Sequence, residues 1–203
     1  MRRTFFIGVC SMVFGSATHA QYVQPERNDT VYLMPKANFA GAVAKKMITE
    51  GNSTIKGIAF TKPPAMQRHI GGKNKIVAGH VKIALFPLTP YFEEYLRLKK
   101  EQNPKKLKFA FMSSDAYKCR LEVITNSSGE FTFFNLKPGS YYIETVVDWS
   151  QTRYYDKYVG SGSSNYGTTD YYSKQSYNDH HSDYLKKEVE IKTEGEVVDI
   201  KLN

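Results

Sequence analysis

The sequence predicts an all-β protein: an antiparallel Greek-key β-sandwich of about seven strands, with an N-terminal helix and a short inserted helix. Three observations support this fold class. Apolar residues recur with a period of two in several short segments, as in strands that bury one face. Turn sequences separate these segments. The chain also ends in an apolar strand pattern, and strands of this kind joined by short turns are typical of sandwiches.

The first twenty residues have the composition of an export signal. The chain begins with the basic tripeptide MRR, continues with an apolar run over 4–15 that is short for a membrane span, and reaches a small-residue cleavage pattern at Ala20. We therefore expect residues 1–20 to be a signal peptide. The mature protein would be periplasmic or secreted, without a transmembrane span and without a nucleic-acid partner.

Cleavage near Ala20 would lower the formal charge from +8 to +6 and leave Cys119 as the single cysteine. No internal disulfide is then possible. Cys119 alternates with Leu121 and Val123, so we expect its thiol to lie on the apolar face of a strand and to be inert.

Residues 21–53 form an N-terminal extension that contains an amphipathic helix over Ala37 to Glu50, ended by Gly51. This helix packs on its own sandwich, or it holds the protein to a membrane or a cell-envelope assembly. A second helix is expected to begin after Thr89, a capping residue followed by proline, to end before Pro104, and to lie across a sheet.

The sandwich itself is expected over residues 54–203. A loop over Lys62 to Gly79 carries Pro-Pro and Gly-Gly pairs. Hairpin turns are predicted at Asn126 to Gly129, at Lys137 to Gly139 and at Thr193 to Glu196. The strands are expected around Ile58 and Phe60, Val81 to Leu85, Leu107 to Phe111, Cys119 to Thr125, Phe131 to Leu136, Tyr141 to Trp149, Val189 and Ile191, and Val198 to Leu202.

Alternation divides the strand after the second turn into two faces. One face is expected to be buried, and the opposite face carries Tyr142, Glu144, Val146 and Asp148. The residues expected on the buried face are Tyr141, Ile143, Thr145, Val147 and Trp149.

With the strands in place, the stretch SSGEFTFFNLKPGSYYI resembles the signature of carboxypeptidase regulatory-like domains, the transthyretin-like or prealbumin-like sandwiches. The flanking segments TIKGIAF, VKIALFPLTPYFEEYL and GEVVDIKLN are also similar to those of an uncharacterised exported bacterial branch of that family. The resemblance implies the fold and leaves the activity open. Its motif positions are Gly129, Phe131, Phe133, Leu136, Pro138, Gly139 and Tyr141, which all have structural roles.

Enzymes of similar architecture give explicit tests for catalysis. The chain ends IKLN, whereas hydroxyisourate hydrolases end in Tyr-Arg-Gly-Ser, and it lacks both the H-x-x-E pair of zinc carboxypeptidases and the H-x-H spacing of intradiol dioxygenases. Phosphate loops and nucleophile elbows are absent as well. The sequence predicts a protein that is not an enzyme and needs no cofactor.

Residues 151–184 are rich in tyrosine, serine, glycine and asparagine and poor in aliphatic residues, so we expect a loop that adds little to the core. The composition is similar to that of antibody paratopes, in which tyrosine supplies rigid amphipathic contact area. This loop either binds a protein or glycan of the cell envelope, or packs as a flap over the sandwich edge. The predicted contact residues are Tyr154, Tyr155, Tyr158, Tyr166, Tyr171, Tyr172 and Tyr177.

Two weaker sites are also predicted. A basic run is a candidate for binding an anionic surface, or is simply a solvated helix end. It comprises Arg97, Lys99, Lys100, Lys105, Lys106 and Lys108. Four residues in an exposed polar loop, Asp179, His180, His181 and Asp183, are candidate metal ligands.

Three hypotheses for function therefore remain. The first is an exported, non-enzymatic binding or envelope-structural module that uses the tyrosine-rich loop. The second is a metal-binding protein or metalloenzyme centred on His180 and His181. The third is a subunit of an envelope assembly held by the N-terminal helix.

Overall fold

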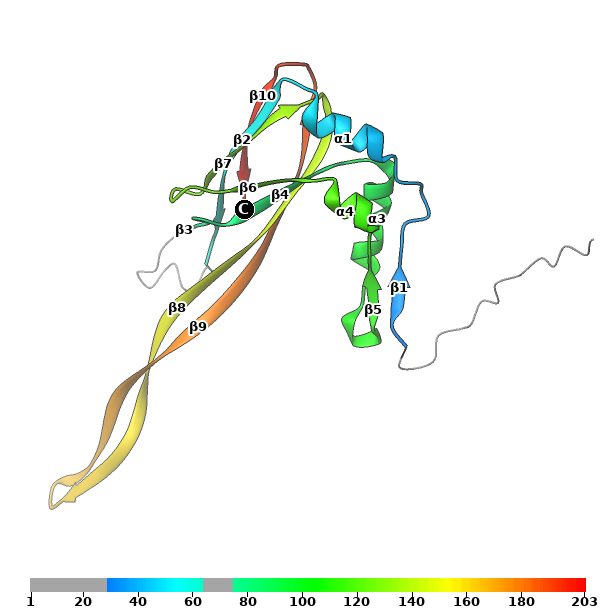
Figure 1. The fold of residues 1–203 in the computed structure, drawn as a ribbon. Coiled ribbons are helices and arrows are strands. Elements are labelled where there is room, and N and C mark those ends of the chain that lie inside the picture. Colours follow the sequence, from blue (N-terminus) through cyan, green and yellow to red (C-terminus); the bar gives the residue numbers. More distant parts are fainter. Residues whose placement is uncertain (1–28, 64–74) are drawn as a thin grey trace, which may run out of the picture.

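The computed structural model describes residues 29–63 and 75–203, and these form a mostly-β protein with two sheets packed face to face (Figure 1). The predicted all-β sandwich is confirmed. The predicted signal peptide and most of the predicted loop over Lys62 to Gly79 lie outside the described residues. Within that loop, Ile76 and Val77 form a short strand, β3.

The first sheet is built around β2 (Ser53–Thr61). The strand β7 (Glu130–Leu136) and the short β3 pair with it antiparallel. On its other edge β2 pairs with β10 (Val197–Leu202), and this pairing is parallel. The expectation of an entirely antiparallel sandwich is therefore wrong in this detail.

The second sheet has the strand order β6, β4, β8, β9, and all its pairings are antiparallel. Its strands are β6 (Leu121–Ile124), β4 (Lys82–Pro87), β8 (Gly139–Ser164) and β9 (Gly167–Ile191). The strands β8 and β9 are far longer than β4 and β6, so both continue beyond the edge of the sheet.

The main core lies between the two sheets. It contains the inward positions of the family-like stretch, which confirms the face assignment from alternation. Its fully or nearly fully buried members include Ile55, Ile83, Leu85, Phe131, Phe133, Leu136, Tyr141, Ile143, Val147, Ile191, Ile200 and Leu202.

A second, smaller core lies on the outer face of the second sheet, under α3 (Pro90–Glu101). Thr89 caps this helix, because its hydroxyl accepts a hydrogen bond from the amide of Phe92, and Pro90 takes the first helical position. The ring of Phe92 stacks on Phe86 with centroids 4.8 Å apart and also packs on Tyr142. Tyr142 is therefore buried although it lies on the face of β8 opposite to the main core.

The N-terminal helix α1 spans Gly41–Thr49, which is shorter than the predicted range of Ala37 to Glu50. Ala44 and Ile48 are buried, and Met47 packs against the main core. The Tyr141 hydroxyl lies within hydrogen-bonding distance of the carbonyl oxygens of Met47, at 2.9 Å, and Lys137, at 2.6 Å, so α1 is fastened to the start of β8. The apolar side of α1 thus packs on its own sandwich.

Away from the sandwich, β1 (Val31–Leu33) pairs parallel with β5 (Lys108–Ala110) beside α3. The 3-10 turn η1 (Pro104–Lys106) precedes β5. A short helix that was not predicted, α4, spans Ser114–Lys118, and Cys119 is its C-terminal capping residue rather than a strand residue. The thiol still packs against the main core, and this burial raises its pKa, which disfavours the reactive thiolate.

The three predicted hairpin turns all carry the chain from one sheet to the other. For example, β6 pairs with β4 in the second sheet, whereas β7 pairs with β2 in the first, so the turn over Asn126 to Gly129 joins two layers. The other two turns lead from β7 to β8 and from β9 to β10, again between sheets. Turn sequences mark where the chain reverses, but they do not specify which strand the next segment will meet.

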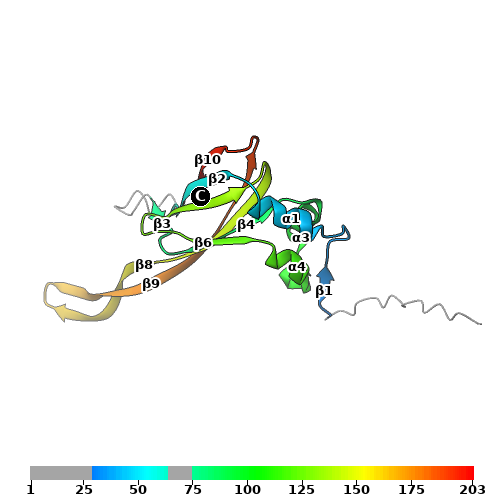
Figure 2. The same cartoon turned by 45° about the horizontal axis from the view of Figure 1, so that its top comes forward.

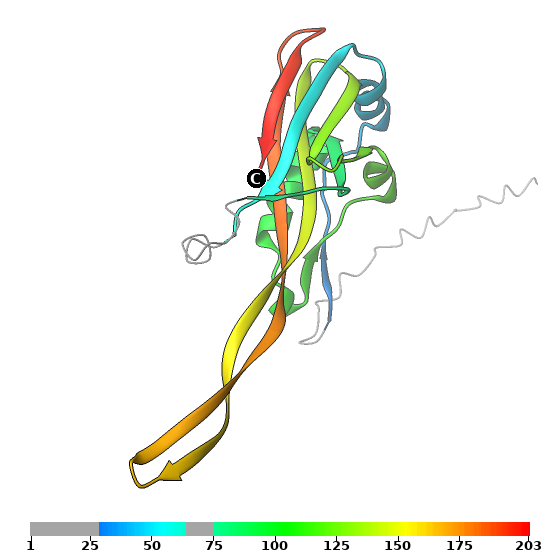
Figure 3. The same ribbon diagram turned by 90° about the vertical axis from the view of Figure 1, so that its left-hand side faces the viewer.

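The expected tyrosine-rich loop is instead the continuation of β8 and β9 as a long antiparallel hairpin, paired from Gly139 and Ile191 out to Ser164 and Gly167. The prediction of a loop over residues 151–184 is therefore wrong. Tyrosine, threonine and valine favour extended backbone, and the segment pairs with itself rather than adding to the core. Figures 2 and 3 show the hairpin leading away from the sheets and from the helices.

Candidate functional site

We call residues 147–183 the arm. It is a two-stranded ribbon, because β4 pairs with β8 only at Tyr141 to Glu144, and no other described strand pairs with β8 or β9 farther out. The two strands cross over each other along the arm, as expected from the strong right-handed twist of two-stranded ribbons (Figure 3). One irregularity interrupts the ladder, between Tyr158 and Gly160.

All seven predicted contact tyrosines lie on the arm, and each is about half exposed or more. The exposed fractions run from 49% for Tyr155 to 100% for Tyr166 at the tip. Alternation divides six of them between the two faces of the ribbon. Tyr154, Tyr158 and Tyr172 share one face, and Tyr155, Tyr171 and Tyr177 share the other.

The arm tyrosines support one another across the ribbon. Tyr158 lies opposite Tyr172 in the ladder, and their rings meet edge to face at 5.8 Å. Tyr155 and Tyr177 form a second pair at 6.1 Å, and the Lys174 ammonium lies 5.2 Å from the Tyr154 ring. These contacts restrict the rings while leaving their outer sides accessible, so the arm presents two aromatic faces.

The base of the arm is held by a cluster centred on Trp149. Its indole ring stacks on His181 with centroids 4.1 Å apart, and its N–H donates to the Asp183 carboxylate at 2.7 Å. The Thr61 hydroxyl, from the other sheet, donates to the same carboxylate oxygen. Trp149 is partly buried, as its predicted place on the inward face requires.

The four candidate metal ligands lie on β9, not in a loop, and strand alternation separates them. Asp179, His181 and Asp183 share one face, whereas His180 points to the other. The Asp179 carboxylate lies 2.8 Å from Nε of Arg153 and 3.3 Å from Nε2 of His181. Within the described part of the chain, no group of three or more histidine, cysteine or acidic side chains is placed to hold a metal ion.

The basic run does not form one patch. Arg97 forms ion pairs with Glu94 and Glu101 on α3, at 3.8 and 2.7 Å. Lys105 and Lys106 lie in η1 and Lys108 begins β5. Only Lys99 and Lys100 face the second sheet, where they line a hollow together with residues of β8 and β9.

This hollow has a volume of about 650 Å³ and lies between the end of α3 and the base of the hairpin. We call it the α3 groove. It is lined by Leu96, Lys99, Lys100, Gln102, Tyr142, Tyr184, Lys186, Lys187 and Glu188. Sequence reasoning missed it because Lys186 and Lys187 are more than eighty residues away from α3, and only the sheet brings them together.

A hydrogen-bonded network forms one wall of the α3 groove. The Lys99 ammonium donates to the Tyr184 hydroxyl at 2.8 Å and to the Glu144 carboxylate at 3.2 Å. Tyr184 donates to Glu144, so Tyr142 is the donor in the 3.0 Å contact between the two phenol oxygens.

The environment of these phenols raises their pKa values above the ordinary value of 10.0. Burial raises the pKa of Tyr184 far above its ordinary value, and its hydrogen bonds to Glu144 and Tyr142 raise it further. Burial also raises the pKa of Tyr142, although its bond to Tyr184 partly opposes that shift. Neighbouring Tyr95 has a raised pKa for the same reason, with the Glu144 carboxylate as the second cause.

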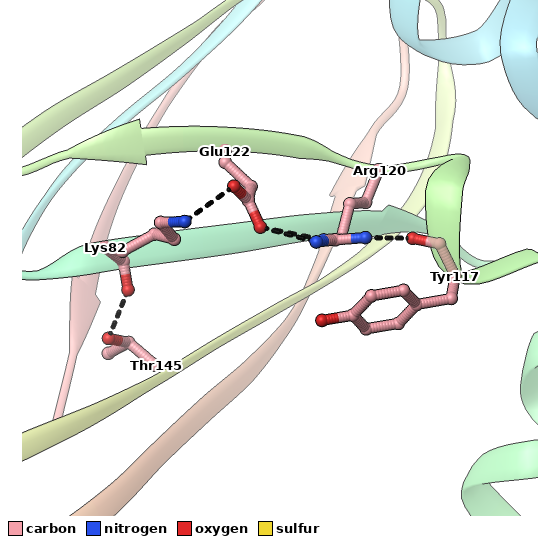
Figure 4. A network of polar contacts seen from close by, with 5 residues as sticks. All are labelled: Lys82, Tyr117, Arg120, Glu122 and Thr145. Atoms are coloured by element: carbon pink, nitrogen blue, oxygen red, sulfur yellow. Dashed lines mark hydrogen bonds and ion pairs between the residues drawn. The ribbon is translucent and has the colours of Figure 1, made fainter. Parts of the chain in front are cut away.

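A second charged network lies on β4 and β6 (Figure 4). The Glu122 carboxylate lies 3.0 Å from the Lys82 ammonium and 2.7 Å from the Arg120 guanidinium, and these hydrogen bonds lower the pKa of Glu122. Arg120 also donates to the Tyr117 carbonyl and lies over the Tyr117 ring, while Thr145 donates to the Lys82 carbonyl at 2.8 Å. One carboxylate bridges the cations of Lys82 and Arg120, so the network joins the two strands.

Comparisons with known proteins show a similar fold but do not assign the chain to a family. No family model matches the chain, and no curated protein matches it. Membership of the carboxypeptidase regulatory-like family therefore stays a prediction. Among solved structures, the chain is similar to a Pseudomonas aeruginosa protein that is provisionally assigned as carbohydrate-binding. The TM-score is 0.53 at 17% identity, and the match covers 83% of this chain and 98% of that protein.

In the described residues, no helix combines the length and the apolar character needed to cross a membrane. The two longest helices, α1 and α3, have 9 and 12 residues, whereas a membrane-spanning helix needs about 20.

Proposed function

We propose that the protein is an exported, non-enzymatic module that binds a glycan of the cell envelope through the aromatic arm. One observation carries the proposal: the seven arm tyrosines lie on a ribbon that projects from the sandwich, and each exposes about half of its surface or more. Aromatic rings gathered on a projecting surface are typical of interaction sites.

The chemistry of the arm suits sugars. A tyrosine ring offers an apolar surface for the C–H face of a pyranose, and its hydroxyl is free to hydrogen-bond at the rim. Between residues 154 and 177 the arm carries two aspartates and two lysines, so it has no net charge. The tyrosines alternate with serine, threonine and glycine, which adapt easily to polar ligands. A neutral or weakly charged glycan fits this surface best.

The comparison with the Pseudomonas protein supports the same class of ligand. That protein is provisionally assigned as carbohydrate-binding, and the likeness extends over nearly its whole length. At 17% identity the likeness shows the fold alone, so the arm tyrosines themselves are the main argument.

The test is a glycan array with the mature protein, followed by calorimetric titration of the best neutral oligosaccharide. Two triple variants separate the faces: Tyr154→Ala/Tyr158→Ala/Tyr172→Ala and Tyr155→Ala/Tyr171→Ala/Tyr177→Ala. Loss of a binding face should weaken affinity by roughly tenfold or more, as for aromatic hot spots. The control is Tyr32→Ala/Tyr117→Ala, which removes two tyrosines that are exposed outside the arm. Full affinity in both arm variants would refute the proposal.

A protein partner is the second candidate, and one observation favours it. The outer edges of the ribbon carry backbone groups that no other described strand pairs with, and such edges accept an added strand. A photoreactive residue in place of Thr169 would then crosslink the arm to a protein in cells. Main-chain pairing does not need the rings, so this crosslink should persist in the tyrosine variants, whereas glycan binding should not.

The metal hypothesis remains a prediction. Metal analysis of the purified protein tests it: stoichiometric zinc, copper or iron that is lost in His180→Ala/His181→Ala would support it. The separation of these two histidines onto opposite faces of β9 is the observation that speaks against it.

A further inference from the structure

A hollow of different chemistry from the arm lies at the base of the arm. The α3 groove brings together four lysines from two distant parts of the chain, Lys99 and Lys100 on α3 and Lys186 and Lys187 on β9. Glu188 is the only acidic residue among those that line it. Lys186 faces the groove, whereas Lys187 lies on the other face of β9, where its ammonium bonds the Lys201 carbonyl. The three ammonium groups of Lys99, Lys100 and Lys186 are costly to hold around one hollow unless an anion offsets their repulsion.

The lysines differ in how far they are already neutralised. Lys99 is paired with Glu144 and forms part of the wall. The Lys187 ammonium donates a hydrogen bond to the carbonyl of Lys201 at 3.2 Å, and this neutral acceptor does not neutralise its charge. Lys100 and Lys186 are exposed and have no carboxylate partner within 4 Å in the described part of the chain. These two ammonium groups are therefore available to an anionic ligand.

The rest of the lining favours a sugar over a small inorganic anion. The hollow of about 650 Å³ is much larger than a phosphate needs, and Leu96 and the Tyr184 ring give it apolar surface. The ammonium groups of Lys99 and Lys186 lie 4.7 and 5.9 Å from the centroid of the Tyr184 ring, and the side chain remains 43% exposed, so part of the ring is accessible to a ligand. Gln102 adds an amide at the rim, which donates and accepts hydrogen bonds as sugar hydroxyls require.

The groove lies next to the base of the arm. Tyr184 lies opposite Val146 in the ladder, and Tyr154 and Tyr158 are an even number of residues farther along β8 from Val146. By alternation, the groove and the face with Tyr154, Tyr158 and Tyr172 therefore begin on the same face of the ribbon. The twist of the ribbon turns that face along the arm, so the groove and the arm tyrosines are distinct surfaces.

We propose that the α3 groove binds a negatively charged sugar unit, with Lys100 and Lys186 contacting its carboxylate and Tyr184 packing against its ring. A membrane surface fits less well, because the lysines surround a hollow beside a helix and do not project from a flat face. The groove is a site separate from the arm tyrosines, so it does not depend on the proposed arm function.

The test uses polygalacturonate oligomers as the carboxylated probe and neutral dextran oligomers as the uncharged one, both titrated into the mature protein. In Lys100→Gln/Lys186→Gln the affinity for polygalacturonate should fall by roughly tenfold or more, because two charge-assisted contacts are lost. Binding by the unmodified protein should also weaken with added salt.

The matched control is Lys105→Gln/Lys106→Gln, which removes the same charge from exposed lysines outside the groove. If this control loses as much affinity as the groove variant, the attraction is a general effect of net charge and the groove proposal is wrong. The protein is also tested with vesicles of anionic phospholipid. If it binds these as tightly as polygalacturonate, and if this binding needs Lys100 and Lys186, the ligand is a membrane surface and the proposal of a sugar site is wrong.

The outcomes separate the two proposals. Neutral glycan binding that is lost in the arm variants and kept in Lys100→Gln/Lys186→Gln, without binding of polygalacturonate, supports the arm and refutes the groove. Polygalacturonate binding that needs Lys100 and Lys186 supports the groove. If neutral glycans are at the same time bound equally well by both arm variants and the unmodified protein, or not bound at all, the arm proposal is refuted.

Discussion

Trp149 stacks on His181 with ring centroids 4.1 Å apart and an interplanar angle of 20°, at the point where β8 and β9 leave the sandwich. The two residues are direct partners in the ladder. Asp183 fixes the indole from one side through its N–H, and it also accepts a hydrogen bond from Thr61 on the other sheet. This pair therefore connects a two-stranded ribbon, which is only marginally stable alone, to a packed core.

The first prediction is that Trp149→Ala loosens the arm and leaves the sandwich folded. The change removes the ring stack and the bond to Asp183, so we expect a loss of about 2 kcal/mol of local stability. Hydrogen exchange of amides over 150–180 should become faster, while exchange in β2 and β4 should stay slow. Tyr154→Ala, farther out on the arm, is the control and should change little. Unchanged protection in Trp149→Ala would show that the stack does not hold the arm.

The second prediction concerns the hydroxyl of Tyr141, which lies 2.9 Å from the carbonyl oxygen of Met47 and 2.6 Å from that of Lys137. Tyr141→Phe keeps the ring in the core and leaves these carbonyls without that donor. Urea unfolding should show a loss of about 1–3 kcal/mol. Tyr32→Phe alters an exposed phenol and should have no effect, and equal midpoints for the two variants would contradict the prediction.

The third prediction is a loss of stability in strong alkali. Burial raises the pKa of Tyr141 to about 12 from an ordinary value of 10.0, and it also raises the pKa values of Tyr142 and Tyr184. A raised pKa in the folded state means that the folded protein holds the proton more tightly than the unfolded chain. The stabilising contribution is therefore complete below pH 10 and is lost as the pH rises through about 12.

Unfolding free energies measured across this range, together with tyrosinate absorbance, check the prediction. The Tyr141→Phe variant should show a shallower decline, because one of the titrating groups is gone. A decline that starts well below pH 10 would instead point to groups other than the buried tyrosines.

The fourth prediction concerns Gly129 in the turn between the two sheets. Its φ is +77°, and a Cβ there would lie 2.6 Å from the carbonyl oxygen of Ala59. Gly129→Ala should therefore cost about 2 kcal/mol or more, from both backbone strain and the clash. Gly167→Ala is the matched control: its φ is also positive, at +129°, but a Cβ there would meet nothing within 4 Å. A smaller loss at Gly129 than at Gly167 in thermal unfolding would contradict the steric argument.

Much of the fold was predictable because the faces of strands and the ends of helices depend on residues that are close together in the sequence. Alternation identified the inward faces of β7 and of the inner part of β8, where Phe131, Phe133, Tyr141 and Ile143 are buried. The capping pattern Thr89-Pro90 likewise identified the start of α3, since the hydroxyl and the ring act within one turn. The expected helix over Ala37 to Glu50 was found with a later start, at Gly41.

The arm was missed although one local signal was present. Runs of tyrosine, serine and threonine lie on both sides of the turn at Ser164 to Gly167, and such runs can pair as a long hairpin. Low aliphatic content predicts a loop when strands are expected to bury one face. A ribbon that buries neither face also needs no aliphatic residues, so composition alone does not distinguish the two. The seven tyrosines are exposed rather than packed over the sandwich edge, and their role as contacts stays a prediction. The strand pairing that displays them was not predicted.

By itself, the sequence determined which residues face the main core and where turns reverse the chain, because these depend on periodicity and on backbone preferences of single residues. Only the tertiary structure decided that β10 pairs parallel with β2, that each turn crosses between sheets, and that Lys100 meets Lys186 beside Tyr184. Strand pairing depends on which faces can pack together, and a groove depends on that pairing. Neither is encoded by the spacing of residues within one segment.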